Sequence, residues 1–347
     1  MPPISALDAI GPAIQRTRTF LFRPFRLPTF LKLCLVALLT EGLGGDFNFS
    51  SPGSHTSPRT HFVDLPSTLT PGLIAAIAAG ALAFIVLCFV LYYLITRLRF
   101  AYFHCLINNT TEIRPGWRLY RSQAARFFWL SVVVGFCFLL LAAILAVPFV
   151  AGFWRMFHRT PAGSPPSLGL LLSLLLPLIP IIFLLVLAGI AADVILRDFM
   201  LPHFALDNAT ASQAWAAAWT RIKAEKASFF VYALLRVILP IAAMIGLFLV
   251  LIIPTLIIVA AFAVLEIGIH SAFADATGAM AFIGIFLEVL VGLIAFCMAL
   301  FASLCVGGPL GTAIREYALL FYGTRYDRLG GFLFPPPSSP LNSLGTA

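Results

Sequence analysis

The sequence predicts an all-α protein, a polytopic transmembrane helical bundle of about six spans. Three observations predict this class: 61% of the 347 residues are hydrophobic, only 10% are charged, and the mean hydropathy is +1.01. A soluble domain carries about 25% charged residues, so these values exclude a water-soluble globular protein. Long apolar stretches, separated by short basic segments, supply the predicted helices.

Six apolar stretches are candidates for membrane spans. A helix needs about 20 apolar residues to cross a hydrocarbon core of ~30 Å, and four stretches meet that length. A fifth, residues 229–265, would be roughly 55 Å long as one helix, so we expect it to tilt, kink or fold back at Pro240 and Pro254. The sixth, residues 30–43, is short enough to be a re-entrant or interfacial segment instead. The four clear stretches are residues 73–96, 127–153, 168–196 and 279–306.

The distribution of Lys and Arg decides between these topologies, because cytoplasmic loops retain cations during insertion. With six spans and both termini cytoplasmic, 18 of the 22 cations lie inside and three lie outside. The split falls to 13 against 8 if residues 30–43 do not cross, and to 15 against 6 if residues 229–265 cross twice. We therefore predict six crossings with both termini cytoplasmic, and neither alternative is eliminated.

One integral membrane domain accounts for residues 1–333, and the proline-rich residues 334–347 are expected to form a disordered tail. Residues 1–26 contain no apolar core before a small-residue cleavage site, so no cleavable signal is expected. The six cysteines lie in or beside apolar runs without CxxC spacing. They are expected to be small buried hydrophobes and to form neither disulfides nor a zinc site.

A short pattern occurs twice in the chain, from His104 to Thr111 and from His203 to Thr210. Each copy has His, four residues, Asn, one residue and Thr, follows a long apolar stretch, and is offset from the other by 99 residues. A weaker echo begins at Ser5. The pattern predicts an internal repeat of three units, each an amphipathic cytoplasmic helix that leads into a helical hairpin. These units are residues 5–96, 111–196 and 210–306.

The third unit begins with the clearest amphipathic helix. Thr210 or Asn208 can cap its first turn, and its Trp and cationic side chains suit the inner headgroup layer. The same features are compatible with a helix that only braces the bundle. A similar surface helix is expected over residues 309–322, with Arg315 and Glu316 on its polar side. The expected apolar stripe is Ala214, Trp215, Ala218, Trp219 and Ile222, and the expected membrane-surface residues are Trp215, Trp219, Arg221, Lys223 and Lys226.

Three ionisable residues lie within the five longer predicted spans: Asp193, Arg236 and Glu288. Such groups are costly in a bilayer and are therefore candidates for binding. Asp193 and Arg236 have comparable predicted depths and are expected to be able to pair. Glu288 lies nearer the midplane, where it needs Arg236, a backbone donor or a proton. A structural ion pair, a proton- or substrate-coupled site and solvation from a lumen all remain open at this stage.

Motifs of soluble catalytic chemistry are absent from the sequence, including phosphate-binding, dinucleotide-binding, zinc-protease and hydrolase signatures. The six His residues are scattered, and no pair has metal-ligand spacing on one helix. We therefore expect no enzymatic activity, no cofactor, no metal and no nucleic-acid partner. The expected partners are the lipid bilayer and a membrane protein or anionic lipid.

Short motifs near both ends of the chain resemble an uncharacterised group of bacterial multi-pass membrane proteins. The motifs are residues 6–10, residues 23–26, the Gly308-Pro309 pair and residues 315–317. The helix-plus-hairpin repeat is also similar to the membrane domain attached to some glycerophosphoryl diester phosphodiesterases. The resemblance implies a bacterial inner-membrane bundle of unknown role over residues 5–326. No catalytic residue is carried over, because the enzymes' catalytic domain is not found here and His158-Arg159-Thr160 departs from their His-Arg-Gly start.

Two functional hypotheses follow from this sequence. The first is a non-enzymatic scaffold or regulator of the bacterial inner (cytoplasmic) membrane that acts on a membrane partner or lipid through its basic cytoplasmic helices. The second is a transporter of a small solute or lipid that uses helices broken by proline, since such breaks expose backbone groups for binding. In that case Arg236 and Glu288 would form the site. The ligand, the partner and the oligomeric state are not indicated by the sequence.

Overall fold

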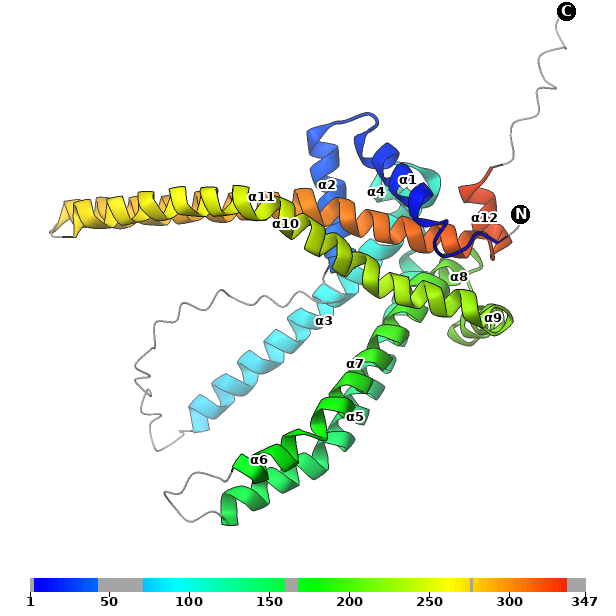
Figure 1. Cartoon of the computed structure of the whole chain (residues 1–347), viewed down its shortest axis with the longest axis horizontal. Helices are drawn as coiled ribbons and strands as arrows, with labels where there is room; N and C mark the ends of the chain where they lie inside the picture. The colour runs from blue at the N-terminus through cyan, green and yellow to red at the C-terminus, as the bar shows by residue number, and fades with distance from the viewer. Residues whose placement is uncertain (1–2, 43–70, 160–167, 275–276, 336–347) are drawn as a thin grey trace, which may run out of the picture. The chain divides into compact units, whose positions relative to one another are not determined.

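The computed structural model describes residues 3–42, 71–159, 168–274 and 277–335. The regular secondary structure of these residues is entirely helical (Figure 1). Residues 336–347, most of the predicted tail, lie outside the described residues, as does residue 43 of the short predicted span. The prediction of an all-α fold is confirmed.

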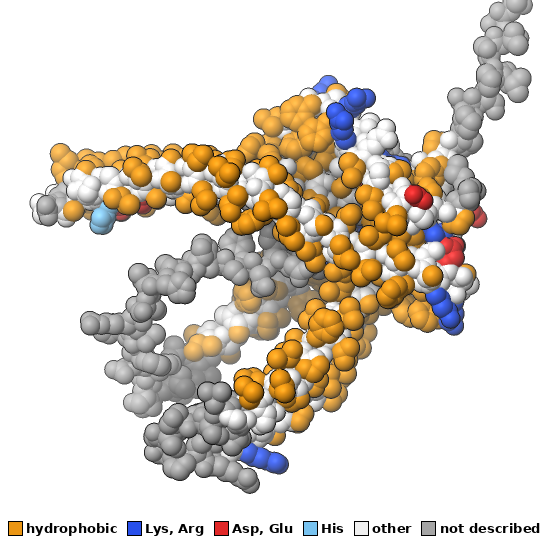
Figure 2. Space-filling model, in the orientation of Figure 1, with side chains coloured by type: hydrophobic (Ala, Val, Ile, Leu, Met, Phe, Trp, Pro, Cys, Tyr) orange, Lys and Arg blue, Asp and Glu red, His pale blue; other side chains and the backbone are white. Residues whose placement is uncertain are grey.

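Five helical segments are long and apolar enough to cross a membrane, which confirms a polytopic membrane protein. Figure 2 shows hydrophobic side chains along the lengths of these helices, and most large side chains there are exposed. A soluble protein does not expose apolar surface of this extent. The segments lie in α3 (Pro71–Asn108), α5 (Arg121–Arg159), α7 (Leu178–Val194) continued by η2 (Ile195–Met200) and α8 (Leu201–Leu206), α10 (Lys226–Phe273) and α11 (Ala279–Gly323).

The sixth predicted span is not among these five segments. Its residues form α2 (Leu27–Ala37), of 11 residues, and the π-helix η1 (Leu38–Gly42), of 5 residues. The described part of this predicted span is shorter than the about 20 residues of a complete apolar span, so a sixth crossing stays a prediction. Cys34 and Ala37 are fully buried, because α2 packs directly on α11: a Cβ atom added to Gly308 would lie only 2.3 Å from that of Cys34. The short segment is therefore part of the packed core.

Proline affects the two predicted broken spans differently. Leu176 and Pro177 form a turn that separates α6 (Leu168–Leu175) from α7, so the predicted fourth span is broken. By contrast, Pro240 and Pro254 both lie inside α10, which continues for 48 residues. Of the three expected alternatives for this stretch, folding back is therefore excluded, since the stretch forms one helix.

The chain forms two compact units that alternate along the sequence. Unit 1 contains residues 1–6, 114–233 and 318–347, and unit 2 contains residues 7–113 and 234–317. Both α10 and α11 contribute to each unit. The shorter helices are α1 (Ile10–Phe22) and α2 in unit 2, and α9 (Ala211–Ala224) and α12 (Asp327–Leu333) in unit 1, while α4 (Ile113–Leu119) begins at the last residue of unit 2.

The core of unit 1 is aromatic. The Phe199 ring contacts the rings of Phe229, Tyr232 and Tyr322, with centroids 5.1 to 5.4 Å apart. The Tyr232 ring stacks on that of Phe321 at 4.4 Å. Such pairs add stabilisation beyond the apolar area that they bury. This core joins η2 to the beginning of α10 and the end of α11.

Candidate functional site

Each of the three ionisable residues predicted inside the bilayer has a polar side-chain partner within its own unit. Asp193 pairs with Arg197 one turn along the same chain segment, at 2.6 Å. Arg236 lies 3.6 Å from Glu41, and Glu288 lies 3.1 Å from Nδ1 of His270. The sequence reasoning did not identify these partners. The predicted contact of Glu288 with Arg236, and the predicted pair of Arg236 with Asp193, stay predictions.

Glu41 is the centre of a buried charged cluster in unit 2. Its carboxylate lies between Arg236 of α10, at 3.6 Å, and Arg315 of α11, at 4.0 Å. Nε of Arg99 donates to the carbonyl of Thr40, at 3.1 Å. Burial of a charge is tolerated when opposite charges and hydrogen bonds compensate for the lost water. The cluster therefore fixes the π-helix η1 against three long helices.

Another ion pair in unit 2 corrects a prediction about the end of α11. Glu316 is fully buried and lies 3.0 Å from Arg16 of α1. Arg16 also donates to the carbonyl of Leu106, at 2.8 Å. Arg315 is only 3% exposed, so neither Arg315 nor Glu316 forms the polar side of a surface helix. Residues 309–322 continue α11 into the packed parts of the two units.

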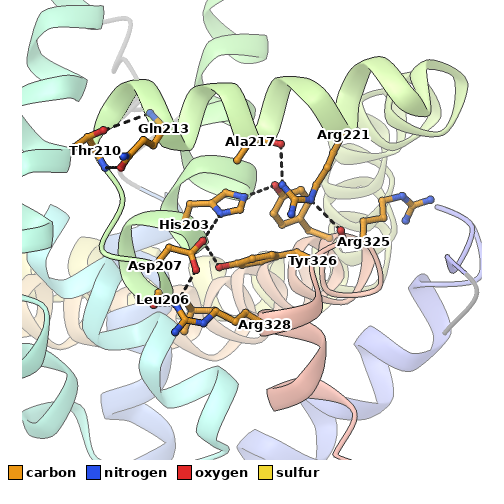
Figure 3. Close-up of polar contacts among 11 residues, drawn as sticks. His203, Leu206, Asp207, Thr210, Gln213, Ala217, Arg221, Arg325, Tyr326 and Arg328 are labelled. Atoms are coloured by element: carbon orange, nitrogen blue, oxygen red, sulfur yellow. Dashed lines mark hydrogen bonds and ion pairs between the residues drawn. The ribbon is translucent and has the colours of Figure 1, made fainter.

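Asp207 is the centre of the polar network in unit 1 (Figure 3). Its carboxylate accepts from Nδ1 of His203 at 2.9 Å and from the hydroxyl of Tyr326 at 2.6 Å. It also accepts from Nη1 of Arg328 at 2.8 Å. Nε2 of His203 lies 2.8 Å from the hydroxyl of Tyr322. Because the carboxylate only accepts, a neutral His203 donates through Nδ1 and accepts a hydrogen bond from the Tyr322 hydroxyl at Nε2.

The network lowers the pKa of Asp207 and raises the pKa of Tyr326. Burial alone would raise the pKa of Asp207, but its hydrogen bonds from His203, Tyr326 and Arg328 lower that pKa below its ordinary value. Burial and the Asp207 carboxylate raise the pKa of Tyr326. Asp207 is therefore the anion of the network, and Tyr326 stays a protonated donor.

Arginines join α9 to the turn between α11 and α12. Nε of Arg221 donates to the carbonyl of Arg325 at 3.0 Å, while Nη1 donates to the carbonyl of Ala217 at 2.9 Å (Figure 3). Arg325 pairs with Glu225 at 2.8 Å and donates to the carbonyl of Ile4 at 3.1 Å. Arg221, a predicted membrane-surface residue, thus has its guanidinium bound within unit 1.

Helix α9 presents different side chains on two faces. A capping box begins it: Thr210 accepts from the amide of Gln213, whose side chain accepts from the amide of Thr210. Ala214 and Ala218 are almost fully buried, whereas Trp215 and Trp219 are 46% and 40% exposed. The two indole rings stack at 5.7 Å with an angle of 12°. The predicted apolar stripe is thus divided between a face packed in unit 1 and an exposed tryptophan face.

Two further tryptophans mark the length of α5. Trp129 and Trp154 are 64% and 67% exposed, and 25 residues separate them. This corresponds to about 37 Å along the helix, slightly more than the ~30 Å of a hydrocarbon core. Tryptophan is enriched at both membrane–water interfaces, so this spacing fits one tryptophan at each interface.

The two copies of the repeated pattern end their helices in the same way. Asn109 and Asn208 have φ values of 51° and 52°, the left-handed conformation in which Asn is tolerated better than most residues. In each copy the His contacts the side chain four residues later, Asn108 at 3.2 Å and Asp207 at 2.9 Å.

The chain matches one protein-family model, described as Family of unknown function (DUF7544), over residues 4–331. The chain belongs to this family. Neither the curated proteins nor the solved structures compared with it contain a match. The DUF7544 match agrees with the expected uncharacterised family, and it gives no link to the phosphodiesterases. Within the described residues of this DUF7544 protein, no three His, Cys, Asp or Glu side chains gather as a metal site requires.

Sequence reasoning missed Glu41, Asp207, Tyr322 and Tyr326. Glu41 lies near the end of the short predicted span, residues 30–43, and its partner Arg236 is far away in the sequence. The unit 1 network had one local signal: His203 and Asp207 are four residues apart, a spacing that brings their side chains together at the end of α8.

Proposed function

We propose that this DUF7544 protein is a non-enzymatic scaffold or regulator of the bacterial inner membrane, acting on a membrane partner or on lipid. The observation that carries this proposal is the two-faced helix α9, which holds a tryptophan pair and Lys223 outward from a packed unit. Around it, charged side chains of unit 1 pair with one another: Arg325 with Glu225, and Arg328 with Asp207. The outward surface of α9, defined as Trp215, Trp219 and Lys223 with the neighbouring Lys226, is therefore the working surface that we propose.

Cytoplasmic location of both termini is part of the proposal. In unit 2, Arg16 of α1 reaches Leu106 near the C-terminal end of α3, whereas α3 begins at Pro71. The N-terminal helix and the start of α3 thus belong to opposite sides of the membrane. The excess of cations in the predicted cytoplasmic segments supports the inside for α1. A fluorescent protein fused to either terminus should fluoresce in bacteria, while alkaline phosphatase fused there should be inactive; the reverse result overturns this topology.

An internal repeat is also proposed, with units near residues 5–96, 111–196 and 210–306. The matching left-handed Asn109 and Asn208 support it. The proposed likeness to the membrane domain of phosphodiesterases concerns architecture only and implies no catalysis here.

Native mass spectrometry of the intact protein in mild detergent tests the scaffold proposal. We expect a stoichiometric protein or a defined set of lipids to stay bound, and to be lost when Lys223 and Lys226 are both changed to Gln. Arg155→Gln is the control, because it also removes one exposed cation, but near the C-terminal end of α5 and not on the proposed working surface. A variant that retains the same bound species as the parent protein would contradict the proposed working surface.

Transport of a small solute or lipid is the second candidate function. The break at Pro177 and the pairing of Glu288 with His270 favour it, since proton-coupled carriers place titratable groups in their spans. Glu288→Gln separates the two functions. A scaffold keeps its bound species in this variant, whereas a proton-coupled carrier loses proton flux into liposomes loaded with a pH-sensitive dye. Unchanged flux would contradict a coupling role for Glu288.

A further inference from the structure

We propose that the outward surface of α9 binds the anionic phospholipid headgroups of the membrane leaflet on its side. This inference rests on the proposed function and names its partner. The ligand chemistry is a lipid phosphate in a headgroup layer, recognised by Lys223 and Lys226 beside the stacked indoles of Trp215 and Trp219.

The orientation of α9 is fixed by contacts within unit 1. Ala214 and Ala218 are 0% and 1% exposed, and Arg221 donates to the carbonyl of Arg325 at 3.0 Å. The capping box at Thr210 holds the beginning of the helix. Since these contacts hold one side of α9 inward, Trp215 and Trp219 stay on the outside without any rearrangement of the helix.

Charge on this surface favours an anion. Nζ of Lys223 lies 5.5 Å from the centroid of the Trp219 ring, and Lys226 is exposed at the beginning of α10. The nearest acid in the sequence, Glu225, is paired with Arg325 at 2.8 Å, so its negative charge is compensated. Each Lys near an anionic lipid surface adds about 1 kcal/mol of attraction. The surface therefore complements a negatively charged leaflet.

The apolar part of α10 begins beside this surface. Phe230, four residues after Lys226, is 71% exposed, and Val231 is 39% exposed. The chain thus changes from lysines to lipid-facing apolar side chains within about one helical turn. Tryptophan prefers this boundary, and the long stem of Lys lies along apolar surface while its ammonium group reaches the headgroups. This continuity favours lipid over a soluble protein as the occupant.

Fluorescence quenching by brominated lipids tests the proposal in the intact protein. One variant keeps Trp219 as its single tryptophan, with the other four changed to Phe, and a companion keeps only Trp129. Both are reconstituted in vesicles of phosphatidylcholine with increasing phosphatidylglycerol, one lipid being brominated at a time. We expect both tryptophans to be quenched, and Trp219 to show a preference for phosphatidylglycerol. Changing Lys223 or Lys226 to Gln should weaken that preference about fivefold each, whereas the Lys→Arg changes should retain it.

Three results would overturn the lipid proposal while Trp129 is quenched and membrane embedding therefore stands. The first is a Trp219 that brominated lipid does not quench but aqueous acrylamide does. The second is equal quenching of Trp219 by both lipids. The third, in native membranes, is a protein partner that cross-links to the α9 surface and shields Trp219 from lipid. If Trp129 itself is not quenched, the embedding fails and the proposed function fails with it.

Discussion

The His104 turn and the His203 turn, residues 104–111 and 203–210, share a sequence pattern but differ in their surroundings. Both end a helix at an Asn in the left-handed conformation, and both place a His beside the fourth following residue. At the first turn that residue is the exposed amide Asn108. At the second it is Asp207, which binds two further side chains, Tyr326 and Arg328, while His203 is only 2% exposed.

The shared pattern determines how the two helices end, at a left-handed Asn. The side chain just before that Asn, Asn108 or Asp207, determines which other parts of the chain the turn contacts. An Asn side chain has a single acceptor oxygen, but a carboxylate can accept several hydrogen bonds at once. Asp207 therefore binds His203 of α8, Tyr326 at the N-cap of α12 and Arg328 within α12. Four experiments compare the two turns, from the largest expected effect to the smallest.

Replacing each His by Ala should separate the turns most strongly. We expect His203→Ala to lower the free energy of unfolding by about 2–3 kcal/mol, because it leaves the buried hydroxyl of Tyr322 and part of Asp207 without their partner. We expect His104→Ala to cost less than about 0.5 kcal/mol, because its side chain is only partly buried. Denaturant unfolding in mild detergent, followed by circular dichroism, measures both. Equal losses would mean that the unit 1 network does not stabilise the fold.

The left-handed asparagines should show a smaller difference. Asn109→Ala and Asn208→Ala should each cost about 1–2 kcal/mol, since a left-handed conformation is unfavourable for a residue with a Cβ atom. The loss should be greater at Asn208, whose side chain also accepts from Arg126. Gly at either position should recover most of the loss. If Gly and Ala behave alike, the conformation of the turn is not what stabilises it.

Removal of the helix cap tests the segment after the second turn. Thr210→Ala should destabilise α9 by about 1 kcal/mol, because it removes the acceptor for the amide of Gln213. Thr220→Ala is the matched control: its hydroxyl only bonds the carbonyl of Ala216 within the same helix, and Ala is the better helix former there. Hydrogen exchange of the α9 amides measures both. Faster exchange in the control than in Thr210→Ala would contradict the capping role.

Acid should lower the stability of the His203 turn through protonation of Asp207. The His104 turn should not respond in this way, because the corresponding residue, Asn108, is uncharged. The pKa of folded Asp207 is lowered, so its contribution is fully present above about pH 4, near its unfolded pKa, and is lost as the pH falls through the folded pKa. We expect less than about 1 kcal/mol, because the side chain is 33% exposed. Asp207→Asn should flatten the decline in stability below about pH 4. An unchanged slope would show that other carboxylates dominate.

Much of the fold could be predicted from apolar lengths, because membrane spans depend on local composition. The capped helix at Thr210 and the break at Pro177 follow from local chemistry in the same way. The short segment around Cys34 could not be placed, because its burial depends on Gly308, which allows close approach of α2 to α11. Arg315 and Glu316 were placed at a surface for a similar reason: the sequence does not reveal their distant partners Glu41 and Arg16.

The spacing of Trp129 and Trp154 on α5 makes the fit of that helix depend on the thickness of the membrane. In a bilayer a few ångströms thinner than this spacing requires, α5 has to tilt or the lipid has to stretch locally. Either response costs a fraction of a kcal/mol per ångström of mismatch. The acyl-chain length of the lipids would then affect the stability of unit 1 as well as its depth in the membrane. A protein built in this way would concentrate where the local bilayer matches α5 best.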